Sequence, residues 1–205
     1  MITIIDYGLG NVSAFGYVYE DIGVPFDIID SPEKLHNKVT HIIIPGVGSF
    51  DNAMRKLIDS GFAKRLNIFF HESQVKIFGV CSGLQIMCKS SQEGSLKGLG
   101  WLDAEVVRIS NKNDSGQNIR LPHMGWNKII NQKKCPLIKD CDQKEFYFLH
   151  SYYINCNNQG DISSTVVYGY PITASVASDR IYGTQFHPEK SHTQGKTILN
   201  NFANL

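Results

Sequence analysis

The sequence predicts an α/β fold in which a mostly parallel open sheet is flanked by helices and extended by antiparallel strands. In residues 1–90, short apolar runs rich in Ile and Val alternate with segments of helical periodicity, which is the pattern of consecutive βα units. After the polar stretch Ser90–Gly94, short β-like runs follow one another between Gly, Asn and Pro, a pattern typical of antiparallel strands. The first part of the chain is therefore expected to form the parallel core, and the second part to add to it.

The first part of the chain contains the expected parallel strands and the helices that connect them. An apolar run such as His41–Ile44 is short and nearly continuous, as expected for a strand that is buried on both faces. Strands are expected at residues 2–5, 26–29, 41–44 and 77–80. Helices are expected at residues 12–22, at residues 51–73 with a break near Gly61, after Cys81, and from a start signal at Ser31-Pro-Glu33.

The second part of the chain contains the expected antiparallel strands and a closing helix. The runs are Ala104–Ile109, Asn127–Ile130, Glu145–Leu149, Ser164–Tyr168, Ile172–Ala177 and Arg180–Phe186, and the helix is Gly195–Ala203. Lys112–Gln117 is expected to be an exposed loop. Because no repeat or linker marks a boundary, residues 1–205 are expected to form a single domain.

Composition excludes several classes of partner. The net charge is +1, from 20 basic and 19 acidic residues, so no global field favours nucleic acid or a membrane surface. Hydrophobic residues make up 42% of the chain, but every apolar run is too short to span a bilayer, and the start of the chain resembles a first strand more than a signal peptide. The five cysteines form no Cys-x-x-Cys pair, which argues against a disulfide framework and a zinc site. We expect a cytoplasmic protein without metal or cofactor.

Cys81 is a candidate nucleophile at the turn between an apolar run and a helical pattern. Gly79 and Gly83 flank it, which is the sequence form of a nucleophile elbow, where small residues let the backbone pass closely. The first N–H groups of the following helix favour a thiolate there. A buried core cysteine is the competing interpretation.

His187 and Glu189 form a candidate base and its orienting group. Pro188 between them restricts the backbone just after an expected strand. An imidazole can accept the thiol proton and return it to a leaving amine, while a carboxylate fixes its tautomer. A structural histidine and a solvated glutamate are the competing interpretations, and the joint occurrence with Cys81 favours a catalytic triad.

Two glycine loops follow expected strands. Asp6–Asn11 contains Gly8 and Gly10 but lacks the third glycine of a dinucleotide fingerprint, so a tight turn is favoured. Pro45–Phe50 lacks the ending of a phosphate-binding P-loop, and its glycines either form a plain turn or leave N–H groups accessible for an oxyanion hole. Because ligands gather beyond the carboxyl ends of parallel strands, both loops and Cys81 are expected at one edge of the sheet.

Several motifs together carry a family resemblance. Gly79-Val-Cys-Ser-Gly-Leu-Gln85 and Gln185-Phe-His-Pro-Glu189 resemble the signature of class I glutamine amidotransferase domains, which have a flavodoxin-like core. Asp6–Asn11, Pro45–Phe50 and Leu121-Pro-His-Met-Gly-Trp-Asn127 make the chain similar to glutaminase subunits of imidazole glycerol phosphate synthases along essentially its whole length. Ser82 stands where that family commonly has a large aliphatic residue, a change that leaves the backbone donor intact.

The resemblance implies hydrolysis of L-glutamine to glutamate and ammonia through a cysteine thioester. It assigns the catalytic roles to Cys81, His187 and Glu189, the oxyanion hole to Val47, Gly48 and Ser82, and contacts with the amino acid group of glutamine to Gln85, Glu93, Ser151 and Tyr152. No metal and no cofactor are implied.

The resemblance also implies a protein partner, a (β/α)₈-barrel cyclase that receives the ammonia in a heterodimer and forms imidazole glycerol phosphate and AICAR in histidine biosynthesis. Positions that match the junction of the subunits are Asn11, Met124, Trp126, Tyr147 and Lys190. A large aromatic on a polar stretch is a common interface anchor, although core packing is the competing interpretation for Trp126.

Other functions stay open at this point. The segment Gly98–Ala104 also resembles a paralogous branch in which the glutaminase supplies ammonia for amidation of a sugar in lipopolysaccharide or surface-polysaccharide synthesis. A stand-alone cysteine hydrolase of γ-glutamyl compounds would use the same triad but would be fully active alone. A non-catalytic scaffold is disfavoured by the intact Cys81, His187 and Glu189.

Overall fold

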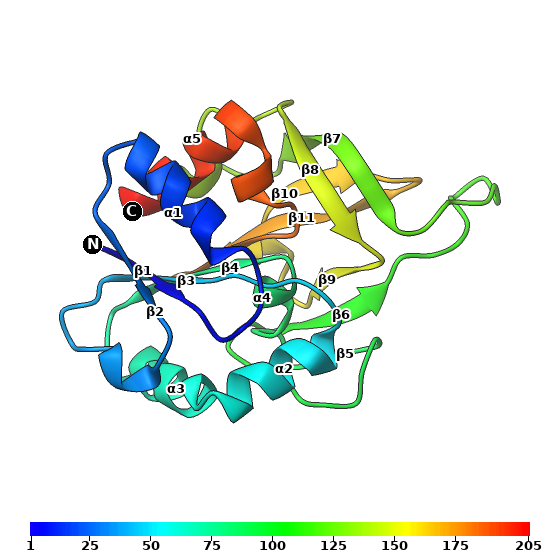
Figure 1. Cartoon of the computed structure of the whole chain (residues 1–205). Coiled ribbons are helices and arrows are strands. Elements are labelled where there is room, and N and C mark those ends of the chain that lie inside the picture. The colour runs from blue at the N-terminus through cyan, green and yellow to red at the C-terminus, as the bar shows by residue number, and fades with distance from the viewer.

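The computed structural model, which describes residues 1–205, is built on a nine-stranded mixed sheet with the strand order β2-β1-β3-β4-β12-β11-β10-β7-β8 (Figure 1). The strands are β1 (Ile2–Ile5), β2 (Phe26–Ile29), β3 (His41–Ile44), β4 (Lys76–Val80), β7 (His123–Asn131), β8 (Glu145–His150), β10 (Ile162–Val167), β11 (Pro171–Ser178) and β12 (Ile181–Thr184). The strands from β2 to β12 in this order are parallel, and the remaining neighbours are antiparallel. The predicted α/β fold class is confirmed.

A smaller sheet and five helices complete the structure. The three-stranded sheet has the order β5-β6-β9, with β5 (Ser90–Ser91), β6 (Ala104–Arg108) and β9 (Tyr152–Cys156). The helices are α1 (Val12–Asp21), α2 (Phe50–Asp59), α3 (Phe62–Glu72), α4 (Ser82–Gln85) and α5 (His192–Ala203). None of them has both the length and the apolar character that crossing a membrane requires.

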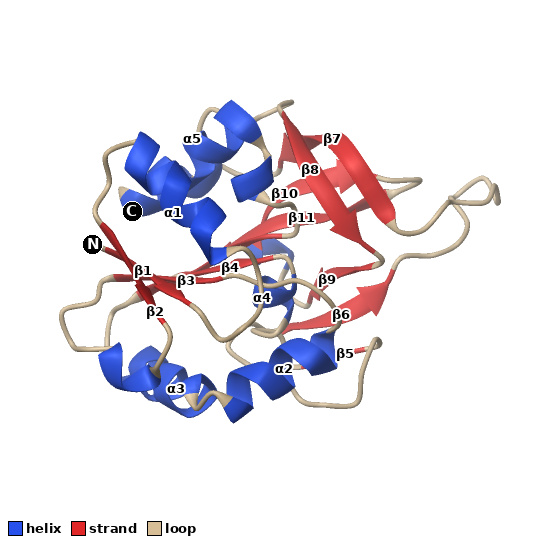
Figure 2. Ribbon diagram, in the orientation of Figure 1, coloured by secondary structure: helices blue, strands red, loops and turns tan.

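The helices cover both faces of the parallel half of the sheet. Helices α1 and α5 lie on one face, and α2 and α3 lie on the other (Figure 2). Successive side chains of a strand alternate between these faces: Ile42 and Ile44 belong to the core under α2 and α3, whereas Ile43 belongs to the core under α1 and α5. Burial on both faces explains why residues 42–44 are three consecutive Ile residues.

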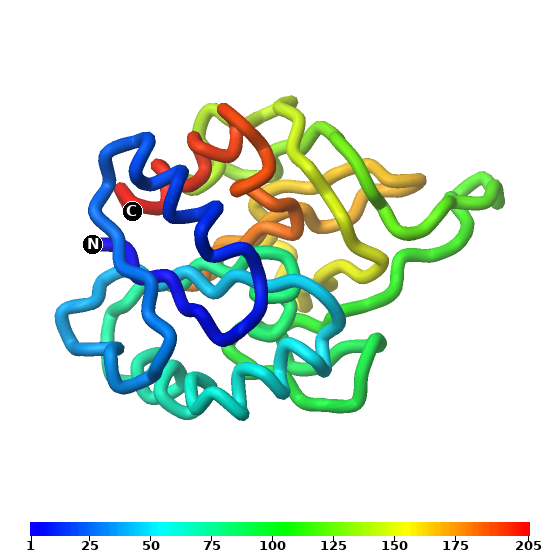
Figure 3. The backbone as a smooth tube through the Cα atoms, viewed as in Figure 1, coloured from blue at the N-terminus to red at the C-terminus, as the bar shows by residue number.

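The chain path brings its last helix back to its first. The backbone trace runs from the N-terminal βα units through the antiparallel strands and returns with α5 beside α1 (Figure 3). The hydroxyl of Tyr19 donates to the carbonyl of Leu199 at 3.3 Å across this contact. The C-terminal strands and the first strands therefore share one core.

The structure corrects the expected elements in four places. The helix after Cys81 is only four residues long, because the carbonyls of the chain that follows pair instead with N–H groups of residues 98–102. The start signal at Ser31 produces only the one-turn 3₁₀ helix Pro32–Lys34. The run Arg180–Phe186 was expected to be antiparallel, but β12 pairs parallel with β4 and antiparallel with β11, so it joins the two halves. Strands β5 and β9 were not expected, because β5 is very short and only Ser151 separates β8 from β9.

Candidate active site

Three loops meet at the carboxyl edge of the parallel strands. The hydroxyl of Tyr7 donates to the carbonyl of Pro45 at 2.7 Å, which ties the first glycine loop to the second. A Cβ added at Gly46 would lie 2.0 Å from the backbone nitrogen of Gly83, so the second loop packs directly on the turn after Cys81. Only glycine permits this approach of the loop to the turn.

Cys81 occupies a strained backbone position between β4 and α4. Its φ is +54° and its ψ is −117°, a conformation that L-residues rarely adopt. The Cys81 N–H donates to the carbonyl of Thr184 at 2.8 Å, which fastens the turn to β12. An added Cβ at Gly83 would lie 2.0 Å from the carbonyl oxygen of Ile44. The turn therefore has the backbone form of a nucleophile elbow.

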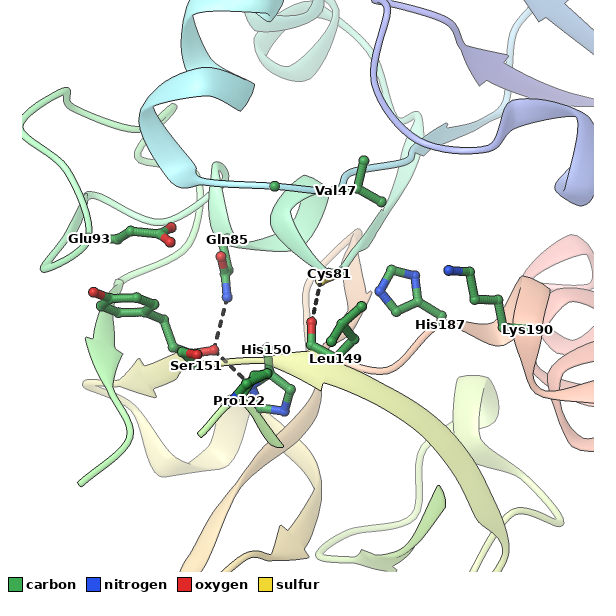
Figure 4. Close-up of a pocket in the computed structure, with 12 residues that line it drawn as sticks. Val47, Cys81, Gln85, Glu93, Pro122, Leu149, His150, Ser151, His187 and Lys190 are labelled. Carbon is green, nitrogen blue, oxygen red and sulfur yellow. Dashed lines mark hydrogen bonds between the residues drawn. The ribbon is translucent and has the colours of Figure 1, made fainter. Parts of the chain in front are cut away.

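His187 and Glu189 form a buried hydrogen-bonded pair next to Cys81. The Nδ1 atom of His187 lies 2.8 Å from Oε1 of Glu189, and each side chain is only 3% exposed. The other side of the ring faces the Cys81 sulfur (Figure 4). Burial alone would lower the pKa of His187, but the charge and hydrogen bonding of Cys81 and the Glu189 carboxylate raise this pKa to about 10. The arrangement makes the imidazole a strong base toward the thiol.

The backbone around His187 is held by the neighbouring strand. Its N–H donates to the carbonyl of Tyr147 in β8 at 2.9 Å. The hydroxyl of Ser191 donates to the carbonyl of His187 at 2.6 Å and accepts from the N–H of Tyr147 at 3.0 Å. The position of the imidazole is thus set by β8 as well as by β12.

A cavity of about 350 Å³ opens over Cys81 and His187. The structure brings together most of the residues that the sequence singled out there (Figure 4). The lining residues are Val47, Gly48, Cys81, Gln85, Glu93, Pro122, Leu149, His150, Ser151, Tyr152, His187 and Lys190. Glu189 lies behind His187, and the side chain of Ser82 is buried beside the second loop, so neither lines the cavity. The cavity has the size of a small-molecule site and suits a free amino acid.

Backbone N–H groups at one end of the cavity are free to bind an anion. The amides of Val47 and Gly48 donate to no other group of the chain, and neither does the amide of Ser82 at the start of α4. Two residues beyond Gly48, the amide of Phe50 at the start of α2 donates to Oε2 of Glu93 at 2.8 Å. The loop is therefore anchored at its far end while its central donors stay unused.

Two buried amide side chains connect the cavity wall to the sulfur. Nε2 of Gln85 donates to the carbonyl of Tyr152 and to Oε1 of Gln185, each at 3.1 Å. Nε2 of Gln185 in turn lies 3.6 Å from the Cys81 sulfur as a donor. This donor to the nucleophile was missed at the level of sequence, although Gln185 stands inside the motif that contains His187.

An exposed apolar surface adjoins the cavity. We call it the outer face of β7 and β8, formed by Met124, Trp126, Tyr147 and Leu149, where Met124 pairs with Leu149 and Trp126 with Tyr147 across the two strands. Met124, Trp126 and Leu149 are 65%, 45% and 39% exposed. The ammonium of Lys190 lies 5.8 Å from the centre of the Tyr147 ring.

The remaining residue expected at a subunit junction, Asn11, caps a helix. Its side chain accepts from the N–H of Ala14 at 3.2 Å at the start of α1. A residue without an assigned role in the sequence, His192, stacks on Trp126 at 5.1 Å between ring centres. The outer face is therefore continuous with the start of α5.

A family model described as "Glutamine amidotransferase class-I" matches residues 3–205, nearly the whole chain that carries this site. The chain belongs to the class I glutamine amidotransferase family. The resemblance seen in the motifs is thereby confirmed.

Relatives of this amidotransferase are similar to it from end to end. "Imidazole glycerol phosphate synthase subunit HisH" from Leptospira borgpetersenii is 42% identical over 206 residues, which cover 100% of both chains. The protein of the same name from Bdellovibrio bacteriovorus is 40% identical over 207 residues, again with 100% of both chains covered. Among solved structures, "Crystal structure of glutamine amidotransferase" has a TM-score of 0.75 at 16% identity and covers 100% of both chains, which supports the fold alone.

The amidotransferase also has a buried histidine pair that the sequence did not reveal. His150 lines the cavity, and its partner His123 lies within the Leu121–Asn127 motif. Nothing in the sequence shows that they meet, because their contact depends on the register of β7 against β8.

Proposed function

We propose that this chain is the glutaminase subunit of an imidazole glycerol phosphate synthase and works in histidine biosynthesis. Relatives that carry this subunit's name align with it from end to end at 42% and 40% identity. The observation that carries the proposal is the Cys81 thiol at a strained elbow, facing the buried His187–Glu189 pair across a cavity that also contains Glu93. These groups fit hydrolysis of a side-chain amide of a free amino acid.

In the first step, Cys81 attacks the side-chain amide carbon of glutamine. The imidazole of His187 accepts the thiol proton while Glu189 holds its Nδ1–H and stabilises the charged ring. A carbon–sulfur bond forms, and the amide oxygen becomes an oxyanion. The free amides of Val47, Gly48 and Ser82 are the available donors to it, and one such donor is commonly worth about 3 kcal/mol.

In the second step, ammonia leaves and the enzyme is regenerated. His187 returns its proton to the leaving nitrogen, the carbon–nitrogen bond breaks, and a γ-glutamyl thioester of Cys81 remains. A water molecule then loses a proton to His187, attacks the thioester and releases glutamate, and the proton returns to the sulfur. Gln185, which donates to the sulfur, supports the thiolate in both steps.

The cavity wall would bind the amino acid end of the substrate. The carboxylate of Glu93 suits the α-ammonium group of glutamine, and it is held in place by the N–H of Phe50. Gln85, Ser151 and Tyr152 line the same wall. A carboxylate placed there favours an amino acid over a plain amide.

The ammonia would pass to a (β/α)₈-barrel cyclase docked on the outer face of β7 and β8. The cavity rim shares Leu149 with that face and also includes Lys190 beside Tyr147, so a protein docked there would cover the cavity mouth. Exposed apolar residues such as Met124 and Trp126 suit such an interface. We expect the complex in the cytoplasm, where the five free cysteines stay reduced.

A second candidate function is the supply of ammonia for amidation of a sugar by a paralogous system. Relatives from Methanococcus maripaludis and Pseudomonas aeruginosa, 40% and 38% identical, are each named as a numbered second copy, so one genome can hold more than one such subunit. In the segment that resembles this branch, Trp101 stacks on Phe70 at 4.8 Å and donates to Asn67, which gives it a packing role. A stand-alone γ-glutamyl hydrolase is less favoured because its outer face would stay bare.

The deciding experiment reconstitutes the chain with a (β/α)₈-barrel cyclase from the same organism. We expect weak glutaminase activity alone, strong activity with the cyclase and its ligand, and formation of imidazole glycerol phosphate. Amidation of a sugar in place of that product would establish the second candidate. Full activity of the isolated chain would overturn both.

A further inference from the structure

A pair of buried histidines connects the outer face of β7 and β8 to the glutamine cavity. His123 begins β7, His150 ends β8, and the two are paired in register. They are 2% and 7% exposed. Each lies on the inner side of its strand, next to an outward-facing neighbour, Met124 or Leu149. Neither has a part in the chemistry described above.

The hydrogen bonds of the pair allow one arrangement of protons when both rings are neutral. Nδ1 of His150 lies 2.9 Å from the carbonyl oxygen of Tyr152, which can only accept, so this nitrogen carries the hydrogen. Nε2 of His150 is then an acceptor, and Nδ1 of His123, 3.0 Å away, must donate to it. Nε2 of His123 is left as an acceptor facing the Asn127 amide at 3.5 Å.

The surroundings keep both rings neutral and fixed. The His123 ring is stacked between Phe148, at 4.6 Å, and Tyr168, at 4.0 Å between ring centres. Burial lowers the pKa of His123 to about 4. Burial and the neighbouring His123 and His187 lower the pKa of His150 to about 3. A proton added to Nε2 of His150 would face the Nδ1–H of His123 and break the bond between the rings, and one added to Nε2 of His123 would face the Asn127 amide.

The chain of bonds ends on the backbone of the cavity wall. The carbonyl of Tyr152 accepts from His150 and also from Gln85, so two buried donors fix one oxygen. Ser151 faces Glu93 across the cavity (Figure 4), and Tyr152 lines the cavity beside it. The position of this wall therefore depends directly on His150 and, through the hydrogen bond between the two rings, on His123 in β7.

We propose that His123 and His150 are positioning residues for the glutamine cavity: the N–H of His123 orients His150, and His150 sets the Tyr152 carbonyl and with it the wall that binds the amino acid end of glutamine. This inference rests on the proposed function and adds residues that act through the wall, without contact with the reacting atoms. Because Cys81, His187 and Glu189 do not hydrogen-bond to the pair, it governs substrate affinity more than turnover.

A crossed pair of substitutions separates the hydrogen bond from the ring packing. His123→Asn keeps a donor near the position of Nδ1 but loses the stacked ring, whereas His123→Phe keeps a ring between Phe148 and Tyr168 but loses the donor. In the glutaminase assay of the assembled complex, we expect His123→Phe to raise KM for glutamine about tenfold with kcat within about twofold. We expect His123→Asn to stay within about twofold of the original KM.

The opposite pattern, an equal effect of both substitutions, or no effect of either would overturn the proposal, because each would show that the donor is not what matters. A second readout does not depend on activity. Histidine ¹⁵N NMR of the unmodified chain is expected to show both rings neutral with hydrogen on Nδ1 from pH 6 to 8, and any other tautomer would overturn the proposal. If the proposed function were wrong, the unmodified complex would be inactive as a glutaminase. The NMR result would then still test the proposed role of the histidine pair.

Discussion

The catalytic edge and the outer face of β7 and β8 differ in how far the chain alone completes them. At the catalytic edge, the polar side chains of His187, Glu189 and Gln185 are buried and bonded to one another or to Cys81. On the outer face, Met124 and Trp126 are largely exposed. The regions meet at Tyr147, whose carbonyl fixes His187 and whose ring faces Lys190. This chain supplies all the catalytic side chains itself, whereas delivery of the ammonia depends on the protein that docks on the outer face.

The largest expected effect comes from removing the nucleophile. Cys81→Ala should lower glutaminase activity of the complex by at least about 10⁴-fold, because no covalent intermediate can form. Binding of the cyclase should be unchanged in a titration, since Cys81 is only 7% exposed. Loss of binding would contradict the separation of the two regions.

The next effect concerns the group that orients the base. Glu189→Gln should lower kcat by about 10²–10⁴-fold, because the imidazole loses the carboxylate that holds its tautomer and stabilises its charge. The pKa of His187 should fall, since Glu189 contributes to raising it, and ¹⁵N NMR can follow this change. Glu20→Gln, on the exposed surface of α1, serves as a control without effect on kcat. An unchanged kcat for Glu189→Gln would contradict the assigned role.

The histidine pair between the two regions should make the fold sensitive to acid. His123 has a pKa near 4 in the folded chain and near 6.5 when unfolded, so the unfolded chain takes up a proton first as the pH falls. Stability should therefore be complete above pH 6.5 and decrease by roughly 3 kcal/mol from His123 alone toward pH 4. Urea unfolding at several pH values measures this, and His123→Phe should show a smaller decrease over the same range.

The smallest expected effect concerns the docking anchor. Trp126→Ala should weaken cyclase binding by about 2 kcal/mol, or roughly 30-fold in Kd, while the isolated chain keeps its stability. The matched control is Ile58→Ala, which removes a 52% exposed hydrophobic side chain from α2, away from the outer face. Equal loss of affinity in both variants, measured by calorimetry, would remove the distinction between this face and the rest of the surface.

The sequence predicts the parallel half of the fold best. Strands buried on both faces, such as β3 with its three consecutive Ile residues, are mostly apolar, so their pattern is easy to recognise. Direction is not encoded in such a pattern, which is why the parallel pairing of β12 with β4 was not expected. The short length of α4 is not visible in the sequence either, because the competing hydrogen bonds come from residues 98–102, a loop without a regular pattern.

The residues of the candidate site also differ in how well the sequence predicts them. Cys81 lies between two glycines and His187 precedes a proline, and these neighbours identify both residues from the sequence alone. The bond from Gln185 to the sulfur and the contact of His123 with His150 join residues 104 and 27 positions apart. Only strand register and side-chain direction create these contacts, and neither is visible in one sequence.

The place of β12 has a consequence for the growing polypeptide. This strand is inserted between β4 and β11 and is synthesised long after β4, because β5 to β11 lie between them in the chain. Until Ile181–Thr184 has left the ribosome, β4 has no neighbour on that side and the thiol at its end has no imidazole beside it. The nascent chain therefore carries its reactive sulfur in an inactive form until β12 and His187 have been synthesised and β12 has paired with β4.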